Sequence, residues 1–166
     1  MKIAILADSH DNVPNMEKAL GWINQRGISL IIHCGDLCAP SILTKVILPK
    51  FSGQLHFVHG NVGDSELLEK LAKDLKNVKI YSQVGEIELD GKKIAFTHQP
   101  EKGKELAQSG KYDLVFYGHT HKPWEEKVGN CRLVNPGTLA GMFYKATFAI
   151  YDPETDKLEL KILEKL

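Results

Sequence analysis

The stretch Leu114-Val-Phe-Tyr-Gly-His-Thr-His121 joins a short apolar run to a glycine and two histidines. The apolar run contains a β-branched residue and two aromatic residues, which is typical of a buried strand. On an extended backbone the side chains of His119 and His121 would point to the same side, so both imidazoles could face one point. Gly118 would let the backbone come close to whatever lies there. The segment therefore predicts either half of a metal site at a strand end or a pair of solvated loop histidines.

The first half of the chain alternates predicted strands with predicted helices. Strands are expected at residues 2–7, 28–33 and 54–59, and helices near residues 14–26, 41–48 and 65–75. Such alternation favours parallel strands joined by right-handed crossovers.

Beyond residue 80 the pattern changes to hairpins, so mostly antiparallel strands are expected there. Asp90-Gly91 is a strong hairpin turn signal between two alternating stretches. Further paired strands are expected at residues 125–128 with 131–134 and at 146–151 with 157–163, and a short helix near 102–109. Two facing sheets with the helices outside would bury both sets of apolar residues. We therefore expect an α/β fold (α+β by some schemes) with two facing mixed β-sheets flanked by helices, in one domain spanning residues 1–166.

Composition narrows the class of protein. Of the 166 residues, 25% are charged and 43% are hydrophobic, which is typical of a folded soluble chain. Lys plus Arg and Asp plus Glu number 21 each, so no net field attracts nucleic acid, and nucleic acid is not the expected substrate. No membrane span or signal peptide is evident. Cys34, Cys38 and Cys131 do not form a paired framework. We expect a cytoplasmic protein without a membrane partner.

Residues that can bind a metal follow five of the predicted strands. They are Asp8 and His10, Asp36, Asn61, His98, and His119 with His121. Ligands collect at the carboxyl ends of strands in open α/β sheets. Any one of these residues alone would usually be a solvated loop residue, but together they predict a metal site.

The kinds of side chain in this set indicate two metal ions. Four histidines, two carboxylates and one amide are too many for one tetrahedral zinc ion. They suit two ions roughly 3.5–4 Å apart that share one carboxylate. Imidazole and carboxylate ligands favour manganese, iron, nickel or zinc over calcium. Two such ions could bind a phosphate and hold a hydroxide that attacks phosphorus in line, which predicts phosphoester hydrolysis.

These motifs, in this order, resemble those of the calcineurin-like metallophosphoesterases. The resemblance rests on Asp8-x-His10, Gly35-Asp36, Gly60-Asn61, His98 and Gly118-His119-x-His121. The short chain, with Ile32-His33-Cys34-Gly35-Asp36 and Asn135-Pro136-Gly137, is similar to the small YfcE-type phosphodiesterases. The resemblance implies a four-layer αββα sandwich.

The resemblance also implies how the ligands divide between two divalent transition metal ions. One ion would be held by Asp8, His10, Asp36 and His121, and the other by Asp36, Asn61, His98 and His119, so that Asp36 bridges them. Manganese is the first candidate, with nickel, iron, magnesium or zinc as alternatives. Asp36, Asn61 and His98 would act in catalysis through a metal-bound hydroxide.

Three further residues are candidates for supporting this centre. His33 and His59 precede ligands and would either orient them or lie in the core. Asn135, in Asn135-Pro136-Gly137, would lie beside the site or simply form a turn.

The activity that the resemblance implies is hydrolysis of a small phosphodiester or nucleotide-like substrate. The alternatives are a phosphomonoesterase or nucleotidase acting at the same site, or a non-catalytic protein-binding scaffold like the retromer subunit of this fold. The oligomeric state is open, with a homodimer among the alternatives.

The chain departs from the family pattern in two places. Val62 follows Asn61, where many members carry a histidine thought to protonate the leaving oxygen. Gly63 resembles a one-residue insertion that displaces Asp64, so the general acid is unassigned. Gln99-Pro100 stands where the family commonly has Gly-His.

Overall fold

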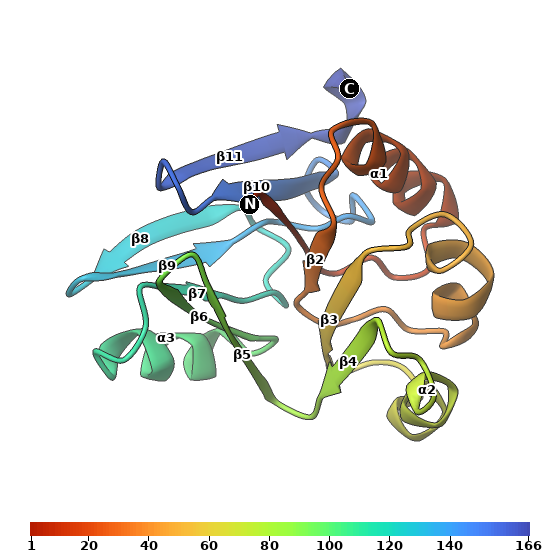
Figure 1. Ribbon diagram of the computed structural model, residues 1–166, viewed down its shortest axis with the longest axis horizontal. Coiled ribbons are helices and arrows are strands. Elements are labelled where there is room, and N and C mark those ends of the chain that lie inside the picture. Colours follow the sequence, from red (N-terminus) through yellow and green to blue (C-terminus); the bar gives the residue numbers. More distant parts are fainter.

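Two β-sheets that face each other form the centre of the molecule, and the computed structural model describes residues 1–166 (Figure 1). The strands are β1 (Ile3–Leu6), β2 (Leu30–His33), β3 (Gln54–Val58), β4 (Val78–Tyr81), β5 (Val84–Leu89), β6 (Lys92–Thr97), β7 (Leu114–Phe116), β8 (Trp124–Val128), β9 (Cys131–Asn135), β10 (Thr147–Asp152) and β11 (Lys157–Ile162). The helices are α1 (Val13–Gln25), α2 (Ser65–Ala72) and α3 (Pro100–Gln108), with a π-helix η1 (Leu43–Ile47) and a 3₁₀ helix η2 (Leu163–Lys165).

The first sheet has the strand order β11-β10-β1-β2-β3-β4. β1, β2, β3 and β4 run parallel, because α1, η1 and α2 return the chain across one face. β10 joins this sheet antiparallel to β1, and β11 pairs antiparallel with β10 at the edge, so the end of the chain completes the sheet that its beginning started. All four residues of β1 and of β2 are buried, as expected for strands covered on both faces.

The second sheet has the order β5-β6-β7-β9-β8. The hairpins β5–β6, β8–β9 and β10–β11 are as predicted. The expectation that this half would be mostly antiparallel is wrong for the middle of the sheet, where β6–β7 and β7–β9 are parallel. α3 connects β6 to β7 and lets them run parallel, and Pro100 starts that helix at a position where proline is well suited. β8 lies at the edge and pairs antiparallel with β9, so it returns the chain and β9 runs parallel to β7.

Successive side chains on the strands point to opposite faces of each sheet, and the two sheets with helices on their outer faces make four layers. Ala4 and Leu6 face the core under α1, η1 and α2, whereas Ile3 and Ile5 face the core between the two sheets. A third apolar cluster joins α3 to the outer face of the second sheet. In Figure 1 α1 and α2 lie on the right against the first sheet, and α3 lies at the lower left against the second. The αββα arrangement expected from the sequence is confirmed.

Some local expectations need correction. The helix near residues 41–48 is π-helical over Leu43–Ile47. The helix expected to reach residue 75 ends at Ala72. Strand β4 was not expected; it is four residues long, and of these Val78 alone is buried. No helix combines the length and the apolar character needed to cross a bilayer.

Candidate metal centre

All seven predicted metal ligands lie in loops that directly follow five strands. β1, β2 and β3 run parallel, so the loops that carry Asp8, His10, Asp36 and Asn61 leave the first sheet at the same edge. β6 and β7, parallel to each other in the second sheet, end just before His98 and the His119–His121 loop. Because the two sheets face each other, the two sets of loops meet, and the structure brings all seven side chains into one neighbourhood.

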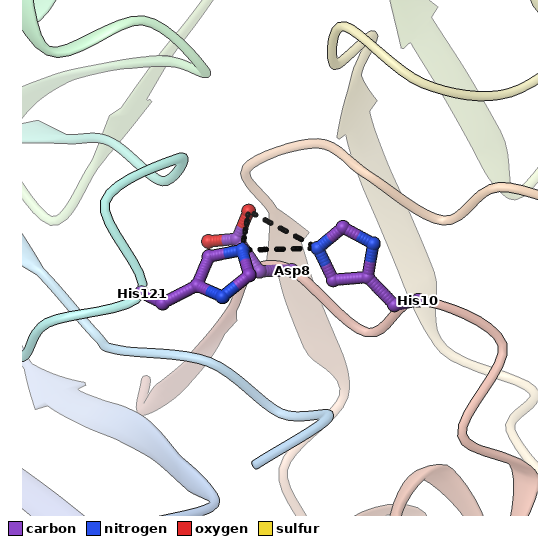
Figure 2. A group of neighbouring side chains, drawn as sticks. All are labelled: Asp8, His10 and His121. Carbon is purple, nitrogen blue, oxygen red and sulfur yellow. Dashed lines mark hydrogen bonds and ion pairs between the residues drawn. The ribbon is translucent and has the colours of Figure 1, made fainter. Parts of the chain in front are cut away.

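The first group of ligands consists of Asp8, His10 and His121 (Figure 2). The Nε2 atoms of His10 and His121 are 3.0 Å apart. Oδ1 of Asp8 lies 3.6 Å from Nε2 of His121 and 4.0 Å from Nε2 of His10. Two imidazole nitrogens and a carboxylate oxygen thus face one point, in the arrangement that a single cation needs.

The second group is formed by His98, Asn61 and His119. Nε2 of His98 lies 2.8 Å from Oδ1 of Asn61 and 3.3 Å from Nδ1 of His119. Nδ1 of His119 is also 2.8 Å from Oδ1 of Asn61. These three side chains come from both sheets and converge on a second point.

Asp36 lies between the two groups. Its Oδ2 is 3.7 Å from Nε2 of His10, and its Oδ1 is 3.4 Å from Nε2 of His98. The carboxylate is 3% exposed, and Oδ1 accepts hydrogen bonds from the backbone N–H groups of Asn61 at 2.9 Å and Val62 at 3.2 Å. Each carboxylate oxygen therefore faces a different group of ligands.

The donor atoms fit divalent transition metal ions. His98 donates its Nδ1–H to the carbonyl of Cys34 at 2.8 Å, so the lone pair of Nε2 points into the centre. That lone pair faces the amide oxygen of Asn61 at 2.8 Å. Two acceptor atoms at this separation repel each other unless a cation lies beside both. The set of imidazole, carboxylate and amide ligands is one that manganese, iron, nickel or zinc accepts.

Burial shifts the pKa values of three of the ligands, Asp8, His98 and His121, so that their neutral forms are favoured. Burial, and then the negative charge of Asp36, raise the pKa of the Asp8 carboxyl to about 8, against an opposing hydrogen bond from the backbone of His119. Burial lowers the pKa of His98 and that of His121. Because burial disfavours the charged forms of these side chains, a bound metal cation would be needed to stabilise a carboxylate here, and the site is suited to hold one.

Five of the seven ligands have left-handed backbone conformations, with φ of 50° at Asp8, 39° at His10, 57° at Asp36, 70° at His119 and 59° at His121. Non-glycine residues adopt this region rarely, and when they do so together they usually belong to a functional site. The expectation that His119 and His121 lie on extended backbone and face one point is therefore wrong. The turned backbone directs His119 to Asn61 and His98, and His121 to Asp8 and His10.

Three glycines leave room for the centre. A Cβ on Gly60 would lie 1.8 Å from Oδ1 of Asp36. A Cβ on Gly35 would lie 2.5 Å from Nδ1 of His98, and one on Gly118 would lie 2.7 Å from the carbonyl oxygen of Cys34. Any larger residue at these positions would displace a ligand or the backbone that supports it.

The three predicted supporting residues take different roles. Asn135 donates from Nδ2 to the carbonyl of Gly118 at 2.9 Å and accepts at Oδ1 from the N–H of Gly137 at 2.8 Å, so it braces the His119–His121 loop. His33 lies 3.1 Å from Oγ of Ser9, in the loop between two ligands. His59 contacts Glu69, with Nε2 2.9 Å from Oε1, and its side chain forms no hydrogen bond with a ligand.

Two residues support the centre without having been singled out in the sequence. Thr138 donates its hydroxyl to the carbonyl of Asp8 at 2.9 Å, and Ser9 links His33 to the Asp8 loop. Ser9 lies between two ligands in the sequence, and this position could have identified it, whereas no sequence pattern marks Thr138. Asp64 caps α2 by accepting the N–H of Leu67 at 2.9 Å, so its carboxylate is used by the helix.

Comparisons with known proteins find relatives that match most of the chain. The family described as "Calcineurin-like phosphoesterase superfamily domain" matches residues 1–156. Phosphodiesterase MJ0936 of Methanocaldococcus jannaschii is 32% identical, over 99% of this chain and 100% of the relative. Phosphodiesterase YfcE of Escherichia coli is 26% identical, over 84% of this chain and 80% of the relative.

Two solved structures show the same fold. The structure of a novel archaeal phosphodiesterase superposes with a TM-score of 0.88 at 28% identity, covering 98% of this chain and 99% of that one. Vps29 of Entamoeba histolytica, solved as a complex with zinc, superposes with a TM-score of 0.71 at 19% identity, covering 96% of this chain and 90% of that one. The second likeness shows the fold alone.

Proposed function

The chain belongs to the calcineurin-like phosphoesterase superfamily and is a hydrolase of phosphoesters, and from this premise we propose that it hydrolyses small phosphodiesters at a centre of two divalent metal ions. The observation that carries the proposal is the position of Asp36. Its two carboxylate oxygens face separate groups of ligands, at 3.7 Å from Nε2 of His10 and 3.4 Å from Nε2 of His98. One carboxylate that serves two groups is suited to bridge two ions.

The ligands divide as follows in this proposal. One ion is held by Asp8, His10, Asp36 and His121, and the other by Asp36, Asn61, His98 and His119. Manganese is the first candidate for both ions, and nickel, iron, magnesium and zinc are the alternatives, because all of them accept imidazole and oxygen ligands. The seven ligands form the proposed catalytic centre, and Asp36, Asn61 and His98 are the residues we assign to catalysis.

When bound, two such ions supply Lewis acidity toward a phosphate and lower the pKa of a coordinated water from 15.7 to about 7. The chain's own residues supply position and orientation. His98 is fixed by its hydrogen bond to Cys34, and Asp36 by the backbone N–H groups of Asn61 and Val62. Asn135 fixes the loop that carries the two remaining histidines. Ligands held in this way need little rearrangement when substrate binds.

A phosphodiester is the proposed substrate because the relatives MJ0936 and YfcE are named phosphodiesterases. A phosphomonoesterase or nucleotidase would use the same centre, and a protein-binding scaffold of this fold would not need it. The complete set of ligands, five of them held in strained backbone, favours catalysis over the scaffold. We also propose a cytoplasmic location, in keeping with three free cysteines.

Turnover with defined metals tests the proposal. Metal-free protein is loaded separately with manganese, nickel, iron, magnesium or zinc, and the bound metal is counted by elemental analysis. We expect about two ions per chain and faster hydrolysis of bis(p-nitrophenyl) phosphate than of p-nitrophenyl phosphate. The opposite preference would establish a monoesterase. No turnover of either compound by protein that holds both ions would leave the scaffold as the function.

A further inference from the structure

A cavity of about 420 Å³ adjoins the proposed metal centre on the side of Asn61. It lies where the loop after β3 meets α2 and the turn between β4 and β5. Figure 1 shows these elements in the lower half of the view, with α2 at the right. Gly60 and Asn61 line it, and Asn61 is also one of the proposed metal ligands. Cys38 lines it as well and lies 3.5 Å from Nδ1 of His10, which joins the cavity to the first group of ligands. A molecule bound at the centre would thus extend directly into this space.

The wall of the cavity is polar and carries negative charge. Two carboxylates, Asp64 and Glu69, line it together with the hydroxyl of Ser82 and the amide of Gln83. No lysine or arginine is among its lining residues. Asp64 is engaged in capping α2, whereas the side chain of Glu69 is 59% exposed and contacts only His59. Both carboxylates keep their negative charge, and Glu69 is the one whose oxygens are not engaged in capping the helix.

Apolar side chains close the inner end of this space. Leu37, Phe57 and Leu68 are buried there, and Phe57 lies edge-on to the ring of His59 at 5.9 Å between centroids. The cavity thus has an apolar end and a polar, negatively charged wall. Such a surface suits a small substituent with carbon atoms and either hydroxyl groups or a positive charge. An anionic substituent would be repelled by Glu69 and would find no cationic partner there.

A phosphodiester carries two ester substituents, which extend from the phosphorus atom in different directions. We propose that the cavity holds one of them, and that Glu69 makes the enzyme prefer substrates whose substituent is cationic or neutral and polar over those whose substituent is anionic. This inference rests on the proposed phosphodiesterase function. Glu69 is in this view a specificity-determining residue, while His59 holds its carboxylate against the cavity wall.

Three p-nitrophenyl diesters whose second substituents differ in charge test the inference. Their second substituents are choline (cationic), ethyl (neutral) and 2-carboxyethyl (anionic), and each kcat/KM is measured with the manganese-loaded full chain. We expect the wild type to prefer the choline ester over the carboxyethyl ester. In Glu69→Gln this ratio should fall about threefold to tenfold, mainly through KM, which is the effect of removing one partly screened charge. Glu69→Lys should reverse the preference.

Glu66→Gln is the matched control. Glu66 lies on the same helix and is exposed, but it does not line the cavity, so the ratio should stay at the wild-type value. Equal ratios in the wild type, Glu69→Gln and Glu69→Lys would overturn the inference while the proposed function stands. A fall in Glu66→Gln as large as in Glu69→Gln would also overturn it, since the effect would then be long-range. Failure to hydrolyse any of the three diesters by protein with both ions bound would overturn the proposed function, and the inference with it.

Discussion

Gly60 and Asp36 are so close that a Cβ at residue 60 would lie 1.8 Å from Oδ1 of Asp36 and 2.4 Å from its backbone nitrogen. No side chain fits this gap unless the carboxylate or its backbone moves. Because Asp36 faces both groups of ligands, a displacement here would disturb the whole proposed centre. Glycine is therefore required at residue 60 because Asp36 leaves no space for a side chain. Its backbone conformation is not the reason, since its φ is not in the left-handed region.

The first prediction concerns Gly60→Ala. We expect turnover of bis(p-nitrophenyl) phosphate to fall at least about 100-fold, with loss of bound metal, because misplaced ligands lose both affinity and geometry. Elemental analysis and steady-state kinetics measure the two effects. Gly21→Ala is the control, since nothing lies within 4 Å of a Cβ there and α1 should gain about 1 kcal/mol of stability. Wild-type activity and metal content in Gly60→Ala would show that the contact is unimportant.

The second prediction compares Asp36→Asn with Asn61→Ala. Asp36 is expected to contact both ions and Asn61 only one, so Asp36→Asn should lose close to two ions per chain and Asn61→Ala close to one. Turnover should fall at least about tenfold further in Asp36→Asn, because both ions are weakened together. Metal stoichiometry at matched metal concentration measures this. Equal stoichiometry and equal kinetics in the two variants would refute the bridging role.

The sequence is sufficient to predict the positions of the ligands because each one follows a strand whose apolar pattern is strong. Lys2–Ala7 and Leu114–Tyr117 are examples, since buried parallel strands consist of short apolar runs. The pairing of strands that are distant in the sequence is harder to predict. β10 joins β1 across the length of the chain, and no local pattern in Thr147–Asp152 indicates which sheet it enters.

The backbone conformation at the metal centre also could not be predicted from the sequence. The His119–His121 loop follows a strand, so extended backbone was the natural expectation, yet both histidines have positive φ. Tertiary contacts impose this conformation, since the N–H of His119 donates to Asp8 and Asn135 holds the carbonyl of Gly118. Likewise Thr138 supports Asp8 through a contact that spans most of the chain, and sequence spacing carries no information about it.

The third prediction concerns pH and the metal-free protein. The pKa of Asp8 is about 8 in the folded chain, above its ordinary value of 3.8, so the folded state binds more protons than the unfolded state between these values. The contribution of Asp8 to stability therefore falls as pH rises from about 4 to about 8. Relative to the wild type, metal-free Asp8→Asn should gain several degrees in Tm at pH 8 and little or nothing at pH 4. Thermal unfolding in the presence of a chelator measures the difference.

The same prediction has a second arm in the metal-loaded protein. Bound cations should reverse the effect, because they stabilise the charged carboxylate, so Asp8→Asn should then have the lower Tm. A difference in Tm between wild type and variant that is constant from pH 4 to pH 8 without metal would contradict the raised pKa.

The fourth prediction concerns His56, which is away from the centre. Burial lowers the pKa of His56 to about 4, and its Nδ1 lies 2.9 Å from the hydroxyl of Tyr81. The unfolded state binds more protons than the folded state between about pH 4 and 6.5, so stability falls as pH decreases through this range. His56→Gln should lose less stability between pH 6.5 and 4 than the wild type. Urea unfolding at both pH values measures this, and parallel losses in the two proteins would rule out a role for His56.

The last prediction concerns the general acid, which is unassigned. Val62 follows Asn61, its side chain is 42% exposed, and its backbone N–H already helps to hold Asp36, so a change of its side chain can leave the ligands in place. Val62→His would put an imidazole beside the centre, where it could donate a proton to a departing oxygen. Proton donation matters most for basic leaving groups, since a p-nitrophenolate ion leaves readily without it. We therefore expect the variant to raise turnover of a dialkyl phosphate about tenfold or more while turnover of bis(p-nitrophenyl) phosphate changes little. Equal changes for both substrates, with unchanged metal content, would mean that an acid already present in the chain or a bound water protonates the leaving group.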